Sequence, residues 1–232
     1  EETISWSFFT LTWHSLMLAA IASIVAVLLA LVLAYGKRLR STPLIEGSVR
    51  AAAMGYAVPG TVIAVGVLIP FAWLDNTVDG WMRESFGIST GLLLSGTLVA
   101  LIFAYTVRFL SVSIQAVESG LAKIKPSMDD AGRSLGLRPM GVLRKIHLPI
   151  MKGTVLTALL LVFVDVLKEL PATLILRPFN FNTLAVRAYE MAADERLADA
   201  GAPALMIVLA GIIPVILLSR AISRARAGGE TR

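Results

Sequence analysis

Three charged residues stand close together inside an otherwise apolar stretch. Asp165 and Lys168 are three residues apart, and Glu169 follows directly. A charge at the bilayer centre costs about 2.5 to 3.5 kcal/mol, so these side chains are expected to face protein or water. On one helix Asp165 and Lys168 can form an ion pair, whereas Asp165 and Glu169 share a face and repel each other. A passing cation would relieve that repulsion, so this face is a candidate substrate contact or gate; a structural ion-pair network is the alternative.

Catalytic and metal chemistry find little support in the sequence. The chain has no Cys, and its two histidines, His14 and His147, are isolated, so neither a thiolate site nor a histidine cluster for a metal is expected. No Gly-Lys-Ser/Thr phosphate-binding loop occurs, so the chain is not expected to bind or hydrolyse ATP. We therefore predict a protein that is not an enzyme and holds no cofactor or metal.

The composition is typical of a membrane protein. Hydrophobic residues make up 56% of the 232 positions, charged residues only 16%, and the mean hydropathy is +0.78. The net charge of +5 does not point to nucleic acid, because the basic residues lie between the hydrophobic runs. A lipid bilayer is the expected surrounding, and nucleic acid is not an expected partner.

Five stretches have the roughly 20 apolar residues that a helix needs to cross a bilayer. They are residues 14–35, 49–73, 91–116, 153–176 and 203–222. The sequence thus predicts an all-α, polytopic membrane helix bundle that occupies residues 1–232 as one domain.

The second of these stretches has two features of its own. Small residues spaced four apart, such as Gly60 and Ala64, indicate close approach of a neighbouring helix. Pro59, in the middle of the stretch, is expected to kink the helix. The kink is either purely structural, or the helix lines a pathway and flexes there.

Basic residues set the orientation of the bundle. Of the 21 Lys and Arg, fifteen fall after the first stretch, between the third and fourth, and in the tail from Arg220 onward. The connections on the other side hold four. Because cytoplasmic loops are enriched in Lys and Arg, the N-terminus is predicted outside and the C-terminus in the cytoplasm.

The charged connection of residues 118–152 is too polar to enter the bilayer. Ser127 is expected to cap a short helix with Asp130 as its capping-box partner, and Gly136 is expected to end that helix. A second helix is expected to begin at Pro139 and to present Met140, Leu143, Ile146 and His147 on one face. Two short helices with an apolar face suit the groove of another protein.

The same connection carries a spaced pattern. Its members are Asp130, Ala131, Gly132, Gly136, Ile146, Leu148 and Pro149. The pattern resembles the EAA loop of ABC importer permeases: Glu-Ala-Ala, three residues, Gly, nine residues, Ile-x-Leu-Pro. Asp130 replaces the Glu and Gly132 the second Ala; because Gly weakens a helix by up to about 1 kcal/mol relative to Ala, looser docking is expected. The resemblance implies the type I importer permease fold, in which these residues, with Met140 and Leu143, contact a cytoplasmic ATPase dimer.

Two further runs, residues 168–173 and 177–185, resemble the C-terminal half of ferric iron permeases. The resemblance implies a bacterial inner-membrane subunit that moves ferric iron, with a periplasmic binding protein facing residues 177–202 and a second permease half, fused or separate. A chain beginning with Glu1 is expected to be part of a longer polypeptide. Thiamine, polyamine and phosphonate are alternative cargoes. An ion-coupled secondary transporter that uses Asp165 is the alternative of another class.

Overall fold

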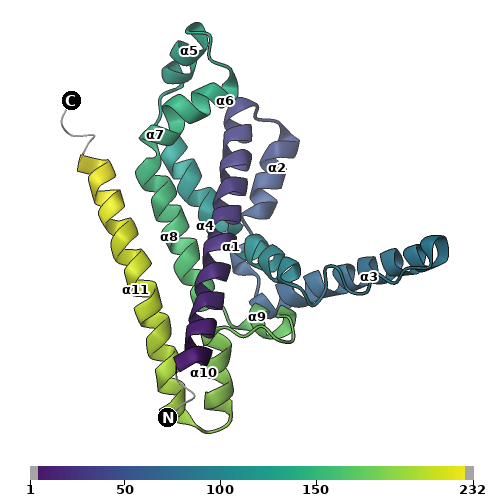
Figure 1. Cartoon of the computed structure of the whole chain (residues 1–232). Coiled ribbons are helices and arrows are strands. Elements are labelled where there is room, and N and C mark those ends of the chain that lie inside the picture. Colours follow the sequence, from purple (N-terminus) through teal and green to yellow (C-terminus); the bar gives the residue numbers. More distant parts are fainter. Residues whose placement is uncertain (1–4, 228–232) are drawn as a thin grey trace.

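The computed structural model describes residues 5–227, and every regular element in that range is a helix (Figure 1). The elements in order are α1 (Ser5–Leu39), α2 (Pro43–Ala52), η1 (Gly55–Ala57), α3 (Gly60–Phe86), α4 (Leu98–Ala122), α5 (Pro126–Ser134), α6 (Pro139–Val142), η2 (Leu143–His147), α7 (Leu148–Ile150), α8 (Lys152–Leu167), α9 (Pro171–Leu176), α10 (Leu184–Ala193) and α11 (Leu197–Ala227). The prediction of orientation also counted basic residues from residue 224 onward. Their side chains lie outside the part of the chain that the structure describes.

Four helices, α1, α3, α4 and α11, are long and apolar enough to cross a membrane. The helical run Pro139–Ile150 and α8 pass the same test only as a pair, bent by 79°, which would make a fifth span. The prediction of an all-helical, polytopic bundle is confirmed. The last stretch, predicted at 203–222, lies within α11.

Helix α1 runs along the length of the bundle and packs against α4 and α8 (Figure 1). A stripe of buried alanines, including Ala22, Ala26, Ala30 and Ala34, runs along it and allows the neighbouring helices to approach closely. Its residues enter both hydrophobic cores, one around Tyr105 on the side of α9 and one on the side of α5–α7. Helix α1 therefore connects the two ends of the molecule through buried contacts.

The prediction of a single helix over residues 49–73 is wrong. The chain leaves α2, makes the short turn η1 and starts α3 at Gly60, so Pro59 is the residue before a helix rather than a kink within one. The residue before a proline is driven from helical to extended backbone, and Val58 has a ψ of 131°. Close approach is still required at Gly55, where a Cβ atom would lie 2.0 Å from the carbonyl oxygen of Val107.

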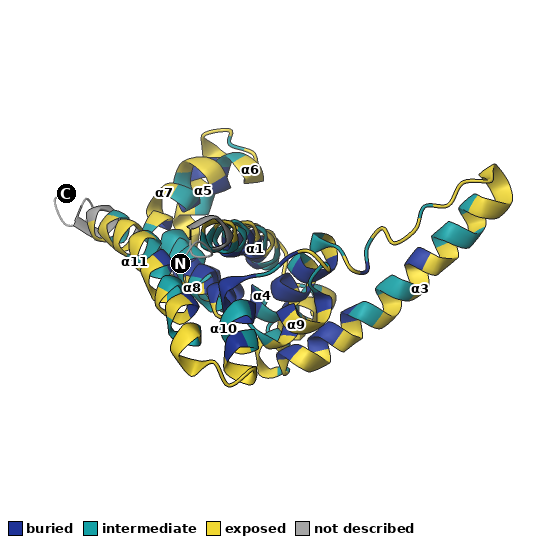
Figure 2. Cartoon of the chain, turned by 60° about the horizontal axis from the view of Figure 1, so that its bottom comes forward, coloured by how far each residue is buried: buried dark blue, intermediate teal, exposed yellow. Residues whose placement is uncertain are grey.

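Helix α3 projects away from the bundle, and the segment before α4 runs back along it (Figure 2). Asp75, buried on α3, accepts backbone N–H bonds from Leu93, Leu94 and Ser95. The helix predicted to begin at residue 91 is α4 (Leu98–Ala122), and it begins later because the backbone N–H groups of residues 93–95 bind the carboxylate of Asp75.

The predicted helix over residues 153–176 is also broken. Helix α8 ends at Leu167, and α9 begins only at Pro171. A proline is favourable at a helix start but unfavourable within a helix, because it lacks the N–H and its ring clashes with the preceding turn. Asp165 and Glu169 therefore do not share one helix face, so the geometry from which their repulsion was predicted is wrong.

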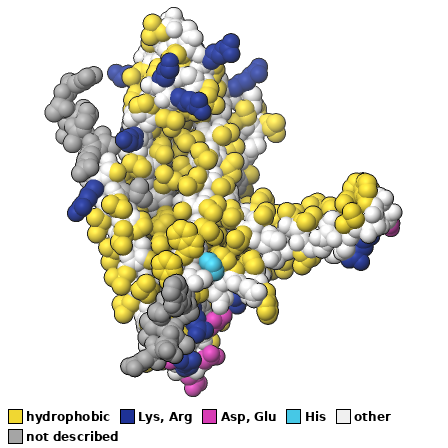
Figure 3. Space-filling model, viewed as in Figure 1, with side chains coloured by type: hydrophobic (Ala, Val, Ile, Leu, Met, Phe, Trp, Pro, Cys, Tyr) yellow, Lys and Arg dark blue, Asp and Glu magenta, His cyan; other side chains and the backbone are white. Residues whose placement is uncertain are grey.

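Charged side chains are distributed unevenly along the long axis of the bundle. Figure 3 shows Lys and Arg side chains gathered at the end that carries α5–α7, whereas the Asp and Glu side chains visible on this face lie at the opposite end, together with further Lys and Arg, and at the far end of α3.

Candidate coupling segment and charged cluster

Helix α5 begins and ends by different means. Its N-cap is Lys125, whose side chain makes no capping bond, and Ser127 lies inside the helix, so the predicted capping box is wrong. At the other end Gly136 has a φ of +81°, its N–H binds the carbonyl of Arg133 at 2.9 Å, and the N–H of Leu137 binds that of Gly132 at 3.0 Å. This is a Schellman motif, which confirms that Gly136 ends the helix.

The helical run after Pro139 does not present one apolar face outward. Leu143 and His147 are buried, and Leu143 belongs to the core that α1 shares with α4 and α8. The prediction that both form an outward face with Met140 is wrong. Met140 itself is exposed by 58%, and Leu135, the residue directly after α5, by 82%. These two side chains, rather than Leu143, are available to a partner.

Gly132 has a packing role that the sequence did not indicate. It is buried, and a Cβ atom there would lie 2.8 Å from Cδ1 of the half-buried Ile146. Its lack of a side chain lets α5 lie closely against η2. The looser docking expected from Gly132 concerns a partner protein and stays a prediction. Among the other residues that match the EAA pattern, Asp130, Ala131 and Pro149 are exposed and Leu148 is half-buried.

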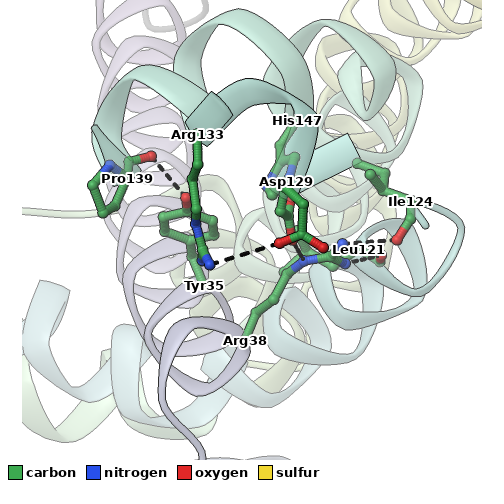
Figure 4. Close-up of polar contacts among 9 residues, drawn as sticks. Tyr35, Arg38, Leu121, Ile124, Asp129, Arg133, Pro139 and His147 are labelled. Carbon is green, nitrogen blue, oxygen red and sulfur yellow. Dashed lines mark hydrogen bonds and ion pairs between the residues drawn. The ribbon is translucent and has the colours of Figure 1, made fainter. Parts of the chain in front are cut away.

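A buried polar network fixes this segment to α1 (Figure 4). Nε of Arg38 lies 2.9 Å from one carboxylate oxygen of Asp129, and Nε2 of His147 contacts the other. The hydroxyl of Tyr35 donates to the carbonyl of Pro139 at 2.7 Å, and its ring meets that of His147 edge-on. Burial alone would raise the pKa of Asp129, but hydrogen bonds from Arg38 and His147 and their charges hold this pKa below its ordinary value.

Sequence reasoning selected Asp130 and missed Asp129. The available signal was helical spacing, since Asp129 is three residues before Gly132 and shares its face. Arg38, 91 residues earlier in the chain, gives no local sign of being the partner.

A second cluster surrounds Glu169, which is exposed by only 7% and sits in the break between α8 and α9. Its carboxylate lies 3.3 Å from Nε of Arg108 on α4 and accepts the N–H of Ala172, at the start of α9, at 3.3 Å. Gly60 lies against both charges: a Cβ atom there would be 2.5 Å from Nη1 of Arg108 and 2.7 Å from Oε1 of Glu169. Pro59 is the residue directly before Gly60, so the backbone at the start of α3 lies against this ion pair.

The predicted pair of Asp165 and Lys168 is confirmed at 3.0 Å, with the Lys168 side chain 65% exposed. The structure does not bring it together with Glu169, whose partner is Arg108. That partner was missed, although Arg108 is the one charged residue of the stretch 91–116. A lone charge within an apolar helix is expected to have a buried partner.

Comparison with known proteins gives the class of the molecule. Residues 22–227 match the family of binding-protein-dependent transport system inner membrane components. The chain belongs to this family, and the predicted identification as a type I ABC importer permease is confirmed. Its relatives are inner-membrane permeases with several spanning helices.

Individual relatives differ in cargo. The chain is 32% identical to the Fe(3+)-transport system permease protein FbpB 2 of Haemophilus influenzae, over 71% of the chain and 29% of that protein. It is 25% identical to the putative 2-aminoethylphosphonate permease PhnV of Salmonella typhimurium, over 72% of the chain and 57% of PhnV. It is 23% identical to the spermidine/putrescine permease PotC of Escherichia coli, over 98% of the chain and 85% of PotC. The chain thus spans less than two thirds of the first two.

Solved structures share the fold. The inward-facing methionine transporter MetNI superposes with a TM-score of 0.71, covering 97% of the chain and 99% of its counterpart at 18% identity. A bacterial importer of alginate superposes with a TM-score of 0.73, covering 95% of the chain and 80% of its counterpart at 13% identity.

Proposed function

We propose that the chain is a permease subunit of an ATP-driven importer, which accepts substrate from a periplasmic binding protein and passes it to the cytoplasm. The observation that carries the proposal is the segment α5–α7. It has the register of the EAA loop, projects from the bundle with α5 and the helical run Pro139–Ile150, and exposes Leu135 and Met140. ATP hydrolysis then belongs to a partner, a cytoplasmic ATPase dimer that receives this segment in its groove.

In this proposal α5–α7 faces the cytoplasm, with the N-terminus outside and the C-terminus inside. The gathering of Lys and Arg at the end with α5–α7 supports this orientation. The opposite end, with residues 177–202, then faces the binding protein, which delivers substrate to this subunit and a second permease half.

Ferric iron is the cargo that we propose. The support is the 32% identity to a ferric iron permease, together with the runs 168–173 and 177–185. A phosphonate or a polyamine is the alternative, given the likeness to PhnV and PotC. We place the pathway or gate at the break between α8 and α9, with Asp165, Lys168, Glu169 and Pro59; Glu169 sits there against Arg108 and the start of α3.

An uptake assay tests this function. Vesicles containing the complete transporter are given its binding protein and labelled ferric iron, aminoethylphosphonate or spermidine, with ATP inside. We expect ATP-dependent uptake that vanadate blocks, with ferric iron as the accumulated species. Uptake of another cargo would change the substrate assignment only. Uptake driven by a proton gradient without ATP would contradict the importer and favour a secondary transporter.

A further inference from the structure

The inner end of α1 holds three other segments at once. Besides its contact with Asp129 of α5, Arg38 donates to the carbonyl of Leu121 at 2.6 Å and to that of Ile124 at 2.8 Å, at the end of α4. Tyr35, one turn earlier, holds the start of α6 through Pro139. Because the Arg38 side chain is only 16% exposed, these bonds are largely shielded from water. The segment α5–α7 (residues 126–150), which we call the coupling segment, is therefore fixed to α1.

The outer end of α1 holds the loop before α10. The ring of His14 stacks on that of Phe181 with centroids 4.3 Å apart, and its Nδ1 lies 3.2 Å from the carbonyl oxygen of Asn182. The hydroxyl of Ser15, which is buried, accepts the N–H of Leu184 at 2.9 Å. These contacts fix α1 to the face that the proposed function gives to the binding protein.

Between the two ends α1 is an uninterrupted helix. The stretch from Ser15 to Arg38 contains no proline, the commonest cause of a kink, and at 1.5 Å per residue it is about 35 Å long. Its alanine stripe packs in both hydrophobic cores. A displacement at one end is therefore passed to the other end instead of being absorbed by a hinge.

We propose that α1 is the mechanical link between the coupling segment and the outer loop, and that Arg38, Tyr35, His14 and Ser15 are the positioning residues that attach it. This inference rests on the proposed function, which supplies the two partners. When the ATPase moves α5–α7, α1 moves with it and shifts residues 181–184. Because binding linkage is reciprocal, the binding protein docked outside changes the state of the ATPase through the same helix.

The test uses the whole transporter, purified with its ATPase and reconstituted in lipid. Three quantities are measured: recovery of the ATPase with the permease, basal ATP hydrolysis, and the factor by which the binding protein stimulates hydrolysis. For Arg38→Met we expect normal recovery and basal hydrolysis, with stimulation reduced about fivefold or more. Lys37→Met is the matched control, since Lys37 neighbours Arg38 and pairs with Glu118, but the two side chains are 38% and 36% exposed. It should leave stimulation unchanged.

Variants at the outer end separate this inference from a local effect at the coupling segment. His14→Ala and Ser15→Ala lie far from the ATPase, and we expect them to lower stimulation with the ATPase still bound and the binding protein still recovered by pull-down. Arg38→Met combined with His14→Ala should be little worse than either alone, because both interrupt one path. Unchanged stimulation in Arg38→Met, or in both outer variants, would overturn the link. A wild-type permease that recovers no ATPase would overturn the proposed function instead.

Discussion

Replacing Arg108 by Met is expected to destabilise the permease by about 3–5 kcal/mol, because it leaves the buried carboxylate of Glu169 without its counter-charge. The only hydrogen bond to this carboxylate that then remains in the described structure is the N–H of Ala172. The break between α8 and α9 would lose its attachment to α4. Thermal unfolding of the purified protein in detergent measures the loss, and uptake measures its functional consequence.

Two variants give this prediction its controls. Lys168→Met removes a cation whose own side chain is 65% exposed, although its partner Asp165 is exposed by only 19%, so a change below about 1 kcal/mol is expected. Arg108→Met combined with Glu169→Gln removes both charges and should recover much of the stability that the single change costs. If Arg108→Met unfolds at the same temperature as Lys168→Met, the buried ion pair does not hold the broken helix in place.

Gly55→Ala is expected to be the second strongly damaging change, at about 3 kcal/mol. The added Cβ atom would lie 2.0 Å from the carbonyl oxygen of Val107 and 3.0 Å from its carbon. Both atoms belong to the backbone of α4, so no side-chain rotation relieves the contact. Helix α4 and the turn η1 must separate, which opens the packing that positions α3.

Gly66→Ala is the matched control, because a Cβ atom there meets nothing within 4 Å and Ala is the better helix former. The two variants should therefore differ in thermal unfolding temperature and in the yield of folded protein, with Gly55→Ala lower in both. Equal behaviour would show that η1 does not lie against α4 in the folded protein.

Hydropathy predicted the helix bundle but misplaced several of its helix boundaries. The apolar character of residues 49–73 and 153–176 is continuous, so a window of 20 residues reads each as one span. The interruptions occur where Pro59 precedes α3 and Pro171 begins α9, and where Gly60 and Glu169 meet Arg108. Proline gives a local signal for such a break, but the ion pair that holds the break open joins positions far apart in the chain.

For the coupling segment, the sequence predicted the spacing of the motif residues but not which of its side chains face the rest of the protein. The αL conformation at Gly136 follows from its residue type and position. Helical periodicity identifies which residues share a face, but not which face is covered by the rest of the protein. Leu143 and His147 face inward because Tyr35 of α1 shares the hydrophobic core with Leu143 and meets the ring of His147. The ring of His147 also contacts Asp129, which Arg38 of α1 binds. That information lies roughly a hundred residues away from the motif.

The central claim is that a cytoplasmic ATPase engages the exposed tip of α5–α7. Because the chain has no Cys, single cysteines at Leu135 or Met140 allow site-specific crosslinking in the intact, active transporter. We expect both sites to capture the ATPase, and a cysteine at Phe179, which is 97% exposed at the other end of the molecule, to capture none. Active transporter in which neither Leu135→Cys nor Met140→Cys crosslinks to an ATPase would contradict the account.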